Sequence, residues 1–432
     1  MSYSKLTIPP KNKSNKYRKL YFIACCFPPF GRGNAITNSC VVNHLAEKFS
    51  VDVVCMKLKE GGLISYQEDE SLKLGIKSNV KVQRVEGANW FGLQTALYIV
   101  GLFPCYFLNW AWQVWRQRTS FFSEGGIVFA VYPVFSDLVL GYLISRRYGF
   151  PFIVDFRDDF SGVMSSGWRR IFRPYYRFLE RKIVRTAKGI SVTTETLRND
   201  LVNRYGLDPT TIRVVYNIVP KIKRPSNSSE NRPEGKLSVI YAGAMSRVQK
   251  PEVLLKAYAQ LLKGDPKWSE RVLVEFYGPE SPYFKLIIRK FFVEGCDFMG
   301  YYPHVEVAKR VIAADIGFFS LSDSIYSYAT PTKLFDYIEA GVPIIASLPN
   351  GAAREIIESN EVGLVADVDD VEGLANCLRE MVLDTGLRAR CRANMLALRY
   401  RFSAEKQIEN WTDMIVSLGL EKAINNEGKL PK

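Results

Sequence analysis

The sequence predicts an α/β protein with two doubly wound domains, each a Rossmann-like parallel sheet. Short apolar runs alternate with helical patterns over residues 17–218, and the alternation starts again over 237–400. Residues 219–236 between them are rich in Pro, Ser and Asn and have no apolar period, which is typical of a linker. A chain of 432 residues, 47% of them hydrophobic, is long enough for two such cores.

Each predicted strand is a short apolar run, and a helical pattern between consecutive runs allows the strands to pair in parallel. In the first half these runs are Lys19–Cys26, Val51–Cys55, Val80–Val85, Ile127–Tyr132, Pro151–Phe156, Gly189–Thr193 and Ile212–Tyr216. In the second half they include Leu237–Ala242, Val272–Tyr277, Ile316–Leu321 and Val342–Ala346. Residues 401–421 form a last predicted helix with no strand after it. The polar ends, 1–16 and 422–432, are expected to be disordered.

The net charge of +14 indicates an anionic partner, such as nucleic acid, an acidic membrane surface or a phosphorylated substrate. The chain has no long run of like charge, no zinc-finger spacing and no RNA-binding signature, so we expect no nucleic-acid partner. An anionic membrane surface together with a phosphorylated substrate is the better interpretation.

The cysteine pattern and the N-terminus predict a cytoplasmic protein. Eight cysteines are scattered without the CxxC spacing of zinc or redox sites, and the basic N-terminus has no apolar signal segment. The two histidines, His44 and His304, are expected to pack or to cap a helix. Neither lies in a motif for a base, which counts against Ser–His or metal-dependent hydrolysis.

Two aromatic segments favour contact with a membrane. Residues 90–115 carry no charge and are long enough to span a bilayer, but polar residues, Pro104 and clustered tryptophans interrupt them. We expect a helical segment broken at Pro104, lying in the membrane interface or against the first domain, with a span as a third alternative. Residues 167–188 interleave Arg and Lys with aromatics, which fits a basic amphipathic helix on anionic lipid or a solvated helix covering the sheet.

The stretch Ala314–Ser347 predicts a strand, a loop, a helix and a second strand. Thr330 is expected to cap the helix N-terminus and Pro331 to take its first position. Gly341 suits the left-handed conformation that ends a helix.

One face of that helix is polar and favours an anionic ligand. The free amides of the first turn and the helix dipole suit a diphosphate, to which Lys333 adds a full charge. Asp336, one turn further, is placed to accept hydrogen bonds from ribose hydroxyls. The alternative is an ordinary capped helix with a solvated face. The polar face comprises Thr332, Lys333, Asp336 and Glu339, three and four residues apart.

Two loops of the first half are further candidates. Gly31 and Gly33, between a strand and a helix, let the backbone approach a phosphate or sugar, although the spacing is neither GxGxxG nor a P-loop. In VDFRDDF, Arg157 and Asp158 follow a buried strand, at the edge where doubly wound sheets bind ligands. A salt-bridged strand end is the alternative there.

The segments YAGAMSRVQKPEVLLKAY and PTKLFDYIEAGVPIIAS resemble the donor site of the family 4 glycosyltransferases. The resemblance covers about residues 19–420. It implies the GT-B fold, in which two doubly wound domains face each other across a cleft and a C-terminal helix returns to the first domain. The donor-binding residues that it implies are Gly31, Gly33, Gly243, Thr330, Thr332, Lys333, Leu334 and Asp336.

The chain departs from the family pattern at three positions. Asp336 stands where the family usually has a ribose-binding Glu, and Tyr328 stands where it has a second Glu. Ala244 replaces the Arg that follows the glycine, which leaves Arg247 and Lys250 as the available cations for the donor diphosphate. VDFRDDF resembles a D-L-R-D-x-W stretch of one bacterial subgroup, in which Arg157 and Asp158 would orient donor or acceptor.

The resemblance implies a retaining hexosyl- or related transferase of the bacterial surface-polysaccharide type. It would move sugar from a nucleotide diphosphate donor to a lipid-linked or polysaccharide acceptor at the cytosolic membrane face. A donor diphosphate oxygen would take the acceptor proton, so neither a general base nor a metal or other cofactor is expected. Two alternatives remain: a non-catalytic GT-B module, which the three departures would fit, and another GT-B enzyme such as a sugar-nucleotide epimerase.

Overall fold

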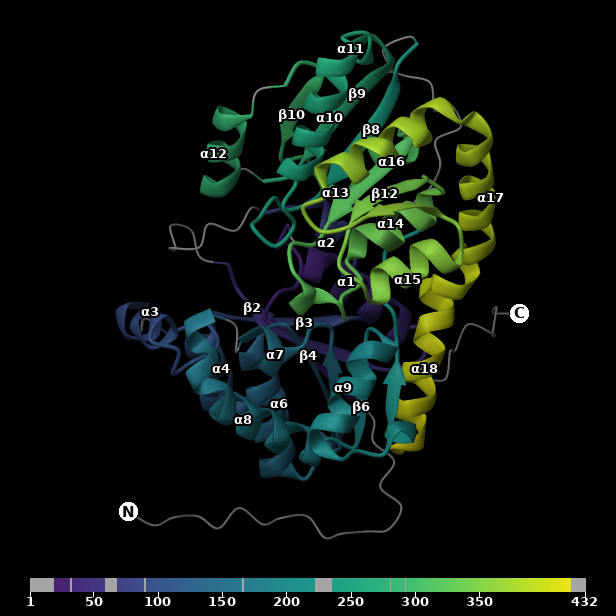
Figure 1. The fold of residues 1–432 in the computed structure, drawn as a ribbon. Helices are drawn as coiled ribbons and strands as arrows, with labels where there is room; N and C mark the ends of the chain where they lie inside the picture. The colour runs from purple at the N-terminus through teal and green to yellow at the C-terminus, as the bar shows by residue number, and fades with distance from the viewer. Residues whose placement is uncertain are drawn as a thin grey trace, which may run out of the picture.

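The computed structural model describes residues 19–31, 33–58, 68–88, 91–164, 167–221, 235–279, 281–291 and 293–420. Within these residues the chain forms two parallel sheets, each with helices on both faces, and the second domain stacks above the first (Figure 1). The ends expected to be disordered and most of the predicted linker, residues 222–234, lie outside the described residues.

The first sheet has seven strands in the order β3-β2-β1-β4-β5-β6-β7. Every neighbouring pair is parallel, and the strand order reverses between β1 and β4, which is the switch point where such sheets bind ligands. The strands are β1 Lys19–Ile23, β2 Val51–Met56, β3 Lys81–Val85, β4 Gly126–Tyr132, β5 Phe152–Phe156, β6 Gly189–Val192 and β7 Ile212–Val214. The connecting helices are α1 Gly33–Leu45, α2 Ser71–Leu74, α3 Phe91–Ile99, α4 Leu108–Arg116, α5 Arg118–Phe121, α6 Phe135–Tyr148, α7 Phe160–Met164, η1 Gly167–Phe172, α8 Arg173–Thr186, α9 Glu195–Tyr205 and η2 Pro209–Thr211.

The second sheet has six parallel strands in the order β10-β9-β8-β11-β12-β13, with its switch point between β8 and β11. The strands are β8 Leu237–Ala242, β9 Val272–Tyr277, β10 Cys296–Gly300, β11 Ile316–Ser320, β12 Ile344–Ser347 and β13 Gly363–Ala366. The helices are α10 Glu252–Gly264, α11 Trp268–Arg271, α12 Pro282–Lys290, α13 His304–Ala313, η3 Ser324–Tyr326, α14 Thr332–Ala340, α15 Ala352–Ser359, α16 Val371–Leu383, α17 Thr385–Phe402 and α18 Ala404–Ser417.

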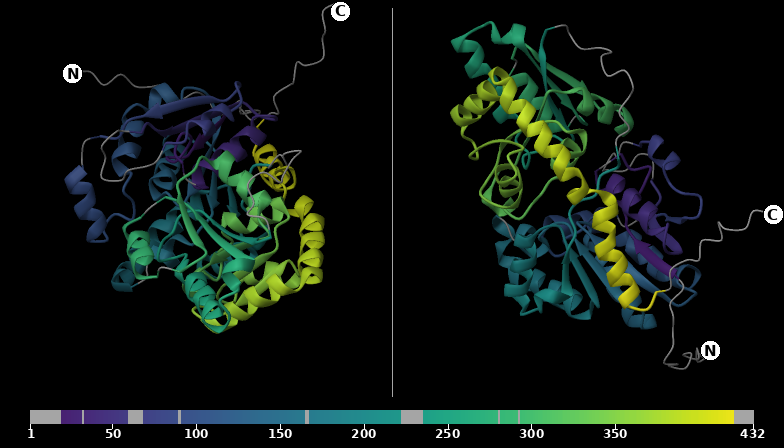
Figure 2. Two further views of the ribbon diagram at one scale, coloured as in Figure 1. Left: turned by 90° about the horizontal axis from the view of Figure 1, so that it is seen from above. Right: turned by 90° about the vertical axis from the view of Figure 1, so that its right-hand side faces the viewer.

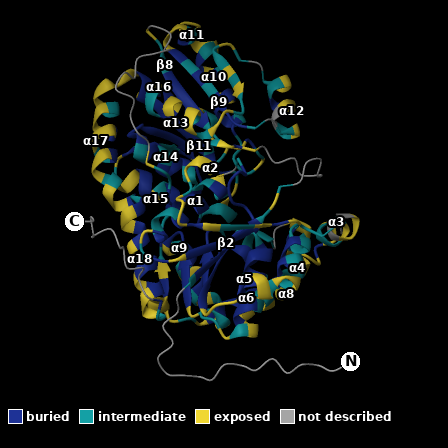
Figure 3. Ribbon diagram, turned by 180° about the vertical axis from the view of Figure 1, so that it is seen from behind, coloured by how far each residue is buried: buried dark blue, intermediate teal, exposed yellow. Residues whose placement is uncertain are grey.

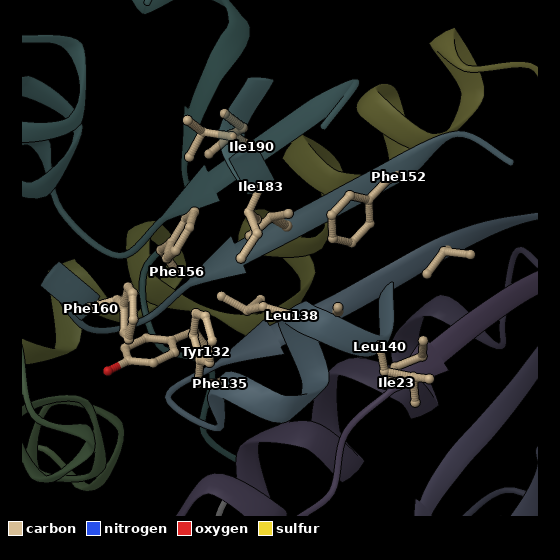
Figure 4. Packing of buried hydrophobic residues seen from close by; sticks show 14 of the residues in the cluster. Ile23, Tyr132, Phe135, Leu138, Leu140, Phe152, Phe156, Phe160, Ile183 and Ile190 are labelled. Carbon is tan, nitrogen blue, oxygen red and sulfur yellow. The ribbon is translucent and has the colours of Figure 1, made fainter. Parts of the chain in front are cut away.

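The central strands are buried on both faces, so their side chains alternate between two cores rather than between core and solvent (Figure 3). On one face of the first sheet, aromatic side chains gather where β4 and β5 end (Figure 4). There the rings of Phe135 and Phe160 stack 4.3 Å apart. This aromatic cluster fixes the loop that follows β5, which carries the predicted site residues Arg157 and Asp158.

The last helix returns from the second domain to the first, as the GT-B resemblance implies. After α17 the chain turns at Ser403, and α18 runs along the first domain (Figure 2). Trp411 of α18 is buried, and its ring meets Phe129 of β4 edge to face at 5.7 Å. The helix therefore contributes apolar side chains to the core of the first domain and ties the two domains together.

The apolar segment 90–115 forms two short helices, α3 and α4, with the predicted break at Pro104 between them. Among the described residues, no helix has both the length and the apolar character needed to cross a membrane. Tyr176 of α8 donates a hydrogen bond of 2.6 Å to the carbonyl of Gly101, which joins this segment to η1 and α8. The two aromatic segments singled out in the sequence therefore lie side by side.

Candidate functional site

The N-termini of two helices from different domains meet at one point. Helix α1 begins at Gly33 in the first domain, and α14 begins at Thr332 in the second. A Cβ atom added to Gly33 would lie 3.8 Å from the Thr332 hydroxyl oxygen. Because helix N-termini present unpaired amides and a partial positive charge, this junction suits an anion held by both domains.

The start of α14 differs from the prediction in one respect. Pro331 is the residue before the helix, with an extended backbone (ψ 147°), and no side chain caps the helix. Thr330 is therefore not the N-cap: its carbonyl accepts a hydrogen bond of 2.8 Å from Asn217 of the first domain, and its buried hydroxyl has no partner among the described residues. The expectation of Thr330 as cap and Pro331 as first helical residue was wrong, because proline takes an extended conformation here.

Lys333 lies at the centre of the site and is buried, with 9% of its surface exposed. Its ammonium lies 4.9 Å from the centre of the Tyr241 ring. Within the described residues it has no carboxylate within ion-pair distance, and burial lowers its pKa to about 8. The charge of Asp336 offsets this effect of burial only in part, and an anionic ligand would supply further negative charge.

Gly243, which follows β8, makes room for this lysine. Its φ is +130°, a conformation that favours glycine, and an added Cβ would lie 2.7 Å from Lys333 Cε and 2.9 Å from Nζ. The glycine is therefore needed twice, for its backbone conformation and for the path of the lysine side chain.

Asp336 lies one turn further along α14 and is half-buried. Burial raises the pKa of its carboxyl to about 7, and the charge of Lys333 acts in the opposite direction. The expected alternative of a solvated polar face does not hold, since Lys333 is buried and Asp336 and Glu339 are half-buried.

Other residues of α14 fix the helix on its sheet. The Tyr337 hydroxyl lies 3.0 Å from the Ile240 carbonyl oxygen and 2.9 Å from that of Phe318, so it bridges β8 and β11. The Leu334 side chain is fully buried in the core, and its amide donates a hydrogen bond of 3.0 Å to the carbonyl of Pro331. Its place in the donor site stays a prediction.

The two cations expected to replace the family Arg have other contacts. Arg247 is exposed, with its guanidinium 6.0 Å from the Tyr283 ring centre. The Lys250 ammonium forms an ion pair of 2.6 Å with Asp369. The structure therefore brings Gly33, Thr332, Lys333 and Gly243 together, whereas the side chains of Arg247 and Lys250 turn to partners of their own. Arg32, next to Gly31 and Gly33, lies outside the described residues.

Three charged residues follow β5, and each has a different role. The first of them is Arg157. Its Nε donates a hydrogen bond of 2.8 Å to Asp155, whose other oxygen accepts one of 2.7 Å from the Ser191 hydroxyl. Both terminal guanidinium nitrogens of Arg157 are buried, and neither has a partner among the described residues. Arg157 is thus a fixed cation with two donors left for a ligand.

Asp159 is structural. Both of its oxygens accept hydrogen bonds from Arg204 of α9, at 2.7 and 2.9 Å, and the same guanidinium lies 3.1 Å from the buried Glu180. Tyr205 also hydrogen-bonds to Glu180. This buried cluster holds the loop after β5 against α8 and α9, and it therefore positions Asp158.

Asp158 faces the other domain. The Tyr328 hydroxyl lies 3.2 Å from the Asp158 carboxylate, and the Tyr328 carbonyl accepts a hydrogen bond of 2.8 Å from Thr194. Burial raises the pKa of Asp158 to about 6, although the hydrogen bond from Tyr328 lowers it. A Glu at position 328 would set two carboxylates against each other, so the tyrosine suits a chain with Asp158 at this place.

Two contacts carried no signal in the sequence, one between the domains and one within the first domain. The amide of His304, where α13 begins, donates a hydrogen bond of 2.9 Å to Asp69 of the first domain. Asp137 is buried at the start of α6 and accepts one of 2.9 Å from the Cys25 amide, and burial raises the pKa of its carboxyl. The only available hint was the position of Asp137 just after a predicted strand.

Comparison with known proteins assigns the chain to a family. Residues 41–221 match the family model described as Glycosyltransferase Family 4, and residues 223–396 match the model described as Glycosyl transferases group 1. The chain belongs to the family 4 glycosyltransferases. The predicted family is thereby confirmed.

Two curated relatives are D-inositol 3-phosphate glycosyltransferases. The one from Nocardioides is 25% identical over 255 residues, which cover 54% of this chain and 55% of the relative. The one from Corynebacterium efficiens is 27% identical over 229 residues, which cover 50% and 53%. The chain spans about half the length of the curated relatives it matches.

Solved structures show the same fold at low sequence identity. Anabaena HepE, solved in complex with UDP and glucose, is 16% identical with a TM-score of 0.68, covering 93% of this chain and 100% of HepE. WaaG, a glycosyltransferase involved in lipopolysaccharide biosynthesis, is 16% identical with a TM-score of 0.65, covering 92% and 99%. The predicted GT-B fold of two Rossmann-like domains is confirmed.

Proposed function

We propose that this family 4 glycosyltransferase transfers a sugar from a nucleotide diphosphate donor to a lipid-linked or polysaccharide acceptor. The observation that carries the proposal is the meeting of two helix N-termini beside the buried, unpaired ammonium of Lys333. The donor diphosphate would lie there, with Gly31 and Gly33 of the first domain on one side. HepE, which shares the fold, was solved with UDP and glucose, and this supports a nucleotide-sugar donor.

The chemistry follows from which charges develop during transfer. As the bond between the sugar and the diphosphate breaks, negative charge grows on the leaving diphosphate, and Lys333 with the helix amides stabilises it. The acceptor hydroxyl attacks the sugar from the face that the leaving diphosphate occupied, so the anomeric configuration is retained. A diphosphate oxygen takes the proton of that hydroxyl. Asp336 would hold the ribose, and Arg157 and Asp158 would orient the donor sugar or the acceptor. Arg247 and Lys250 would reach the diphosphate only by leaving their present partners.

No metal ion takes part in this proposal, because Lys333, Arg157 and the helix amides supply the positive charge. A donor-hydrolysis and transfer assay with a mixture of nucleotide sugars is the direct test. Release of nucleoside diphosphate, at a rate that a chelator such as EDTA leaves unchanged, is the expected result. Nucleotide binding without turnover would favour the alternative of a non-catalytic module, which Tyr328 and Ala244 would fit.

We place the reaction at the cytosolic face of a membrane, because one surface of the first domain combines apolar and basic side chains. Trp168, Ile171 and Phe178, in η1 and α8, are each more than half exposed. Exposed basic residues stand among them, including Arg170 and Arg177. Such a surface binds anionic lipid through both apolar burial and charge. Vesicles containing anionic lipid should pellet the protein at low salt and less so at high salt, and a protein that stays in the supernatant at low salt would refute this placement.

A further inference from the structure

A cavity of the first domain lies between α3, α4 and α6. Its volume is about 440 Å³, which is in the range of small-molecule sites, and every side chain that lines it is apolar. Leu97 of α3, Trp112 and Trp115 of α4, and Val139 and Leu143 of α6 form its walls. We call this cavity the α3–α6 groove.

The groove opens to solvent, and the surface around its opening is apolar too. Leu93, which lines the groove, is 65% exposed, and Trp112 is 44% exposed. Ile99 and Leu102, at the end of α3 and just after it, are also exposed. A contiguous apolar surface of this kind marks a place where another apolar molecule binds.

The surroundings of the groove are cationic. Residues 91–123 contain no Asp or Glu. The Arg118 guanidinium lies 4.5 Å from the ring centre of Trp115, and that of Arg169 lies 4.4 Å from the ring centre of Tyr98 in α3. An apolar groove with a basic rim is complementary to a molecule with a hydrocarbon chain and an anionic head.

The groove also leads toward the domain junction. Helix α6 starts at Phe135, whose ring stacks on Phe160, and Phe160 follows the Arg157–Asp159 loop. Val139 in the groove wall is one turn from Phe135, a rise of about 6 Å. A chain lying in the groove would therefore hold its polar end close to Asp158, which faces the second domain.

From these observations we infer that the α3–α6 groove binds the hydrocarbon chain of the acceptor, as a monomer, and holds the acceptor head at the cleft. This inference rests on the proposed function, and it adds that the acceptor is a lipid phosphate whose chain the protein recognises. Bilayer lipid is the competing occupant, and binding measurements with monomeric ligands separate the two.

The test measures binding of n-octyl, n-decyl and n-dodecyl phosphate to the full chain, each below its micellar concentration, by calorimetry and tryptophan fluorescence. A buried methylene contributes about 0.8 kcal/mol, so affinity should rise about 15-fold for every two carbons at a 1:1 stoichiometry. Affinity that does not depend on chain length, or binding seen only with phospholipid vesicles, would overturn the inference.

Two substitutions test the location. Leu93→Glu at the groove opening and Leu97→Glu in its wall should lower dodecyl phosphate affinity at least tenfold and flatten the dependence on chain length. Leu74→Glu is the matched control, since Leu74 is an 89% exposed leucine on α2 and does not line the groove. Equal losses in Leu93→Glu and Leu74→Glu would refute the location. Leu93 is exposed enough that its variant should fold even if the Leu97 variant does not.

The experiments distinguish an error in the inference about the groove from an error in the proposed function. Sugar transfer to a lipid acceptor without any dependence on chain length would leave the function standing and refute the groove. Binding of alkyl phosphates with the expected slope, by a protein that transfers no sugar, would support the groove and refute the function.

Discussion

Two cations of this protein, Arg204 in the first domain and Lys333 in the second, are both largely shielded from solvent and have opposite surroundings. Arg204 contacts both oxygens of Asp159 and one of Glu180, and these carboxylates raise its pKa despite burial. Lys333 has a tyrosine ring and a glycine beside its ammonium, and burial lowers its pKa to about 8. The difference teaches that a paired buried charge fixes the fold, whereas an unpaired one is available to a ligand.

The largest effect is expected on stability, when the cation of the paired cluster is removed. Arg204→Met leaves Asp159 and Glu180 buried without their cation, so the free energy of unfolding should fall by about 3–5 kcal/mol. Arg198→Met on the same helix removes an i,i+3 pair with Glu195 near the surface and should change it by less than about 1 kcal/mol. Urea unfolding of both variants checks this, and equal losses would contradict the comparison.

Removing the unpaired charge should act on turnover instead. Lys333→Met should lower kcat by about 10²–10³-fold, because charge on the leaving diphosphate loses its main stabilising group. The melting temperature should change little, because Lys333 has no ion pair among the described residues and the half-buried Asp336, whose pKa Lys333 lowers, can take up a proton in the variant. Lys256→Met is the control: this exposed lysine of α10 also lies over an aromatic ring, that of Phe291. Normal turnover of Lys333→Met would mean that its burial serves folding alone.

Activity should depend on pH in a narrow window. The pKa of Asp336 is raised to about 7, so kcat/KM for the donor should rise about tenfold per pH unit below 7 as this carboxyl ionises. The pKa of Lys333 is lowered to about 8, so kcat/KM should fall above pH 8 as the ammonium loses its proton. Lys333→Arg should abolish the alkaline limb and keep the acid limb. A flat profile from pH 6 to 9 would show that neither group titrates in the donor site.

The smallest predicted effect concerns the space beside Lys333. Gly243→Ala should weaken binding of nucleoside diphosphate about tenfold, because the new Cβ, 2.7 Å from Lys333 Cε, displaces the ammonium. Gly264→Ala, at the end of α10 with no atom within 4 Å of the added Cβ, should bind normally. Calorimetry on the two variants decides whether the site needs this glycine.

The elements of the fold could be predicted because they depend on local patterns. Ile316–Leu321 was predicted as a strand from its apolar run, and β11 spans Ile316–Ser320. The start of α14 was misplaced because Thr330 and Pro331 have the residue types of a helix N-terminus, whereas Pro331 is extended and the Thr330 carbonyl accepts a hydrogen bond from Asn217 of the first domain. Local sequence does not report such contacts.

The partners within the site could not be predicted, because they are distant in sequence. Lys333 was assigned to a polar face, and its burial depends on Tyr241 of β8 and on Gly243, which follows that strand. Nothing near Asp158 indicates that Tyr328 donates to it from the other domain. The family pattern supplied the positions of these residues, and the structure supplied their partners.

The central claim is that the α1 and α14 N-termini and Lys333 together hold a diphosphate. Calorimetric titration at pH 7.5 with the nucleoside diphosphate that most raises the melting temperature, and with its nucleoside, tests this most directly. The wild-type protein should bind the diphosphate at least about 100-fold more tightly than the nucleoside, and Lys333→Met should lose most of that difference. Equal affinity of the wild-type protein for nucleoside and diphosphate would contradict the account.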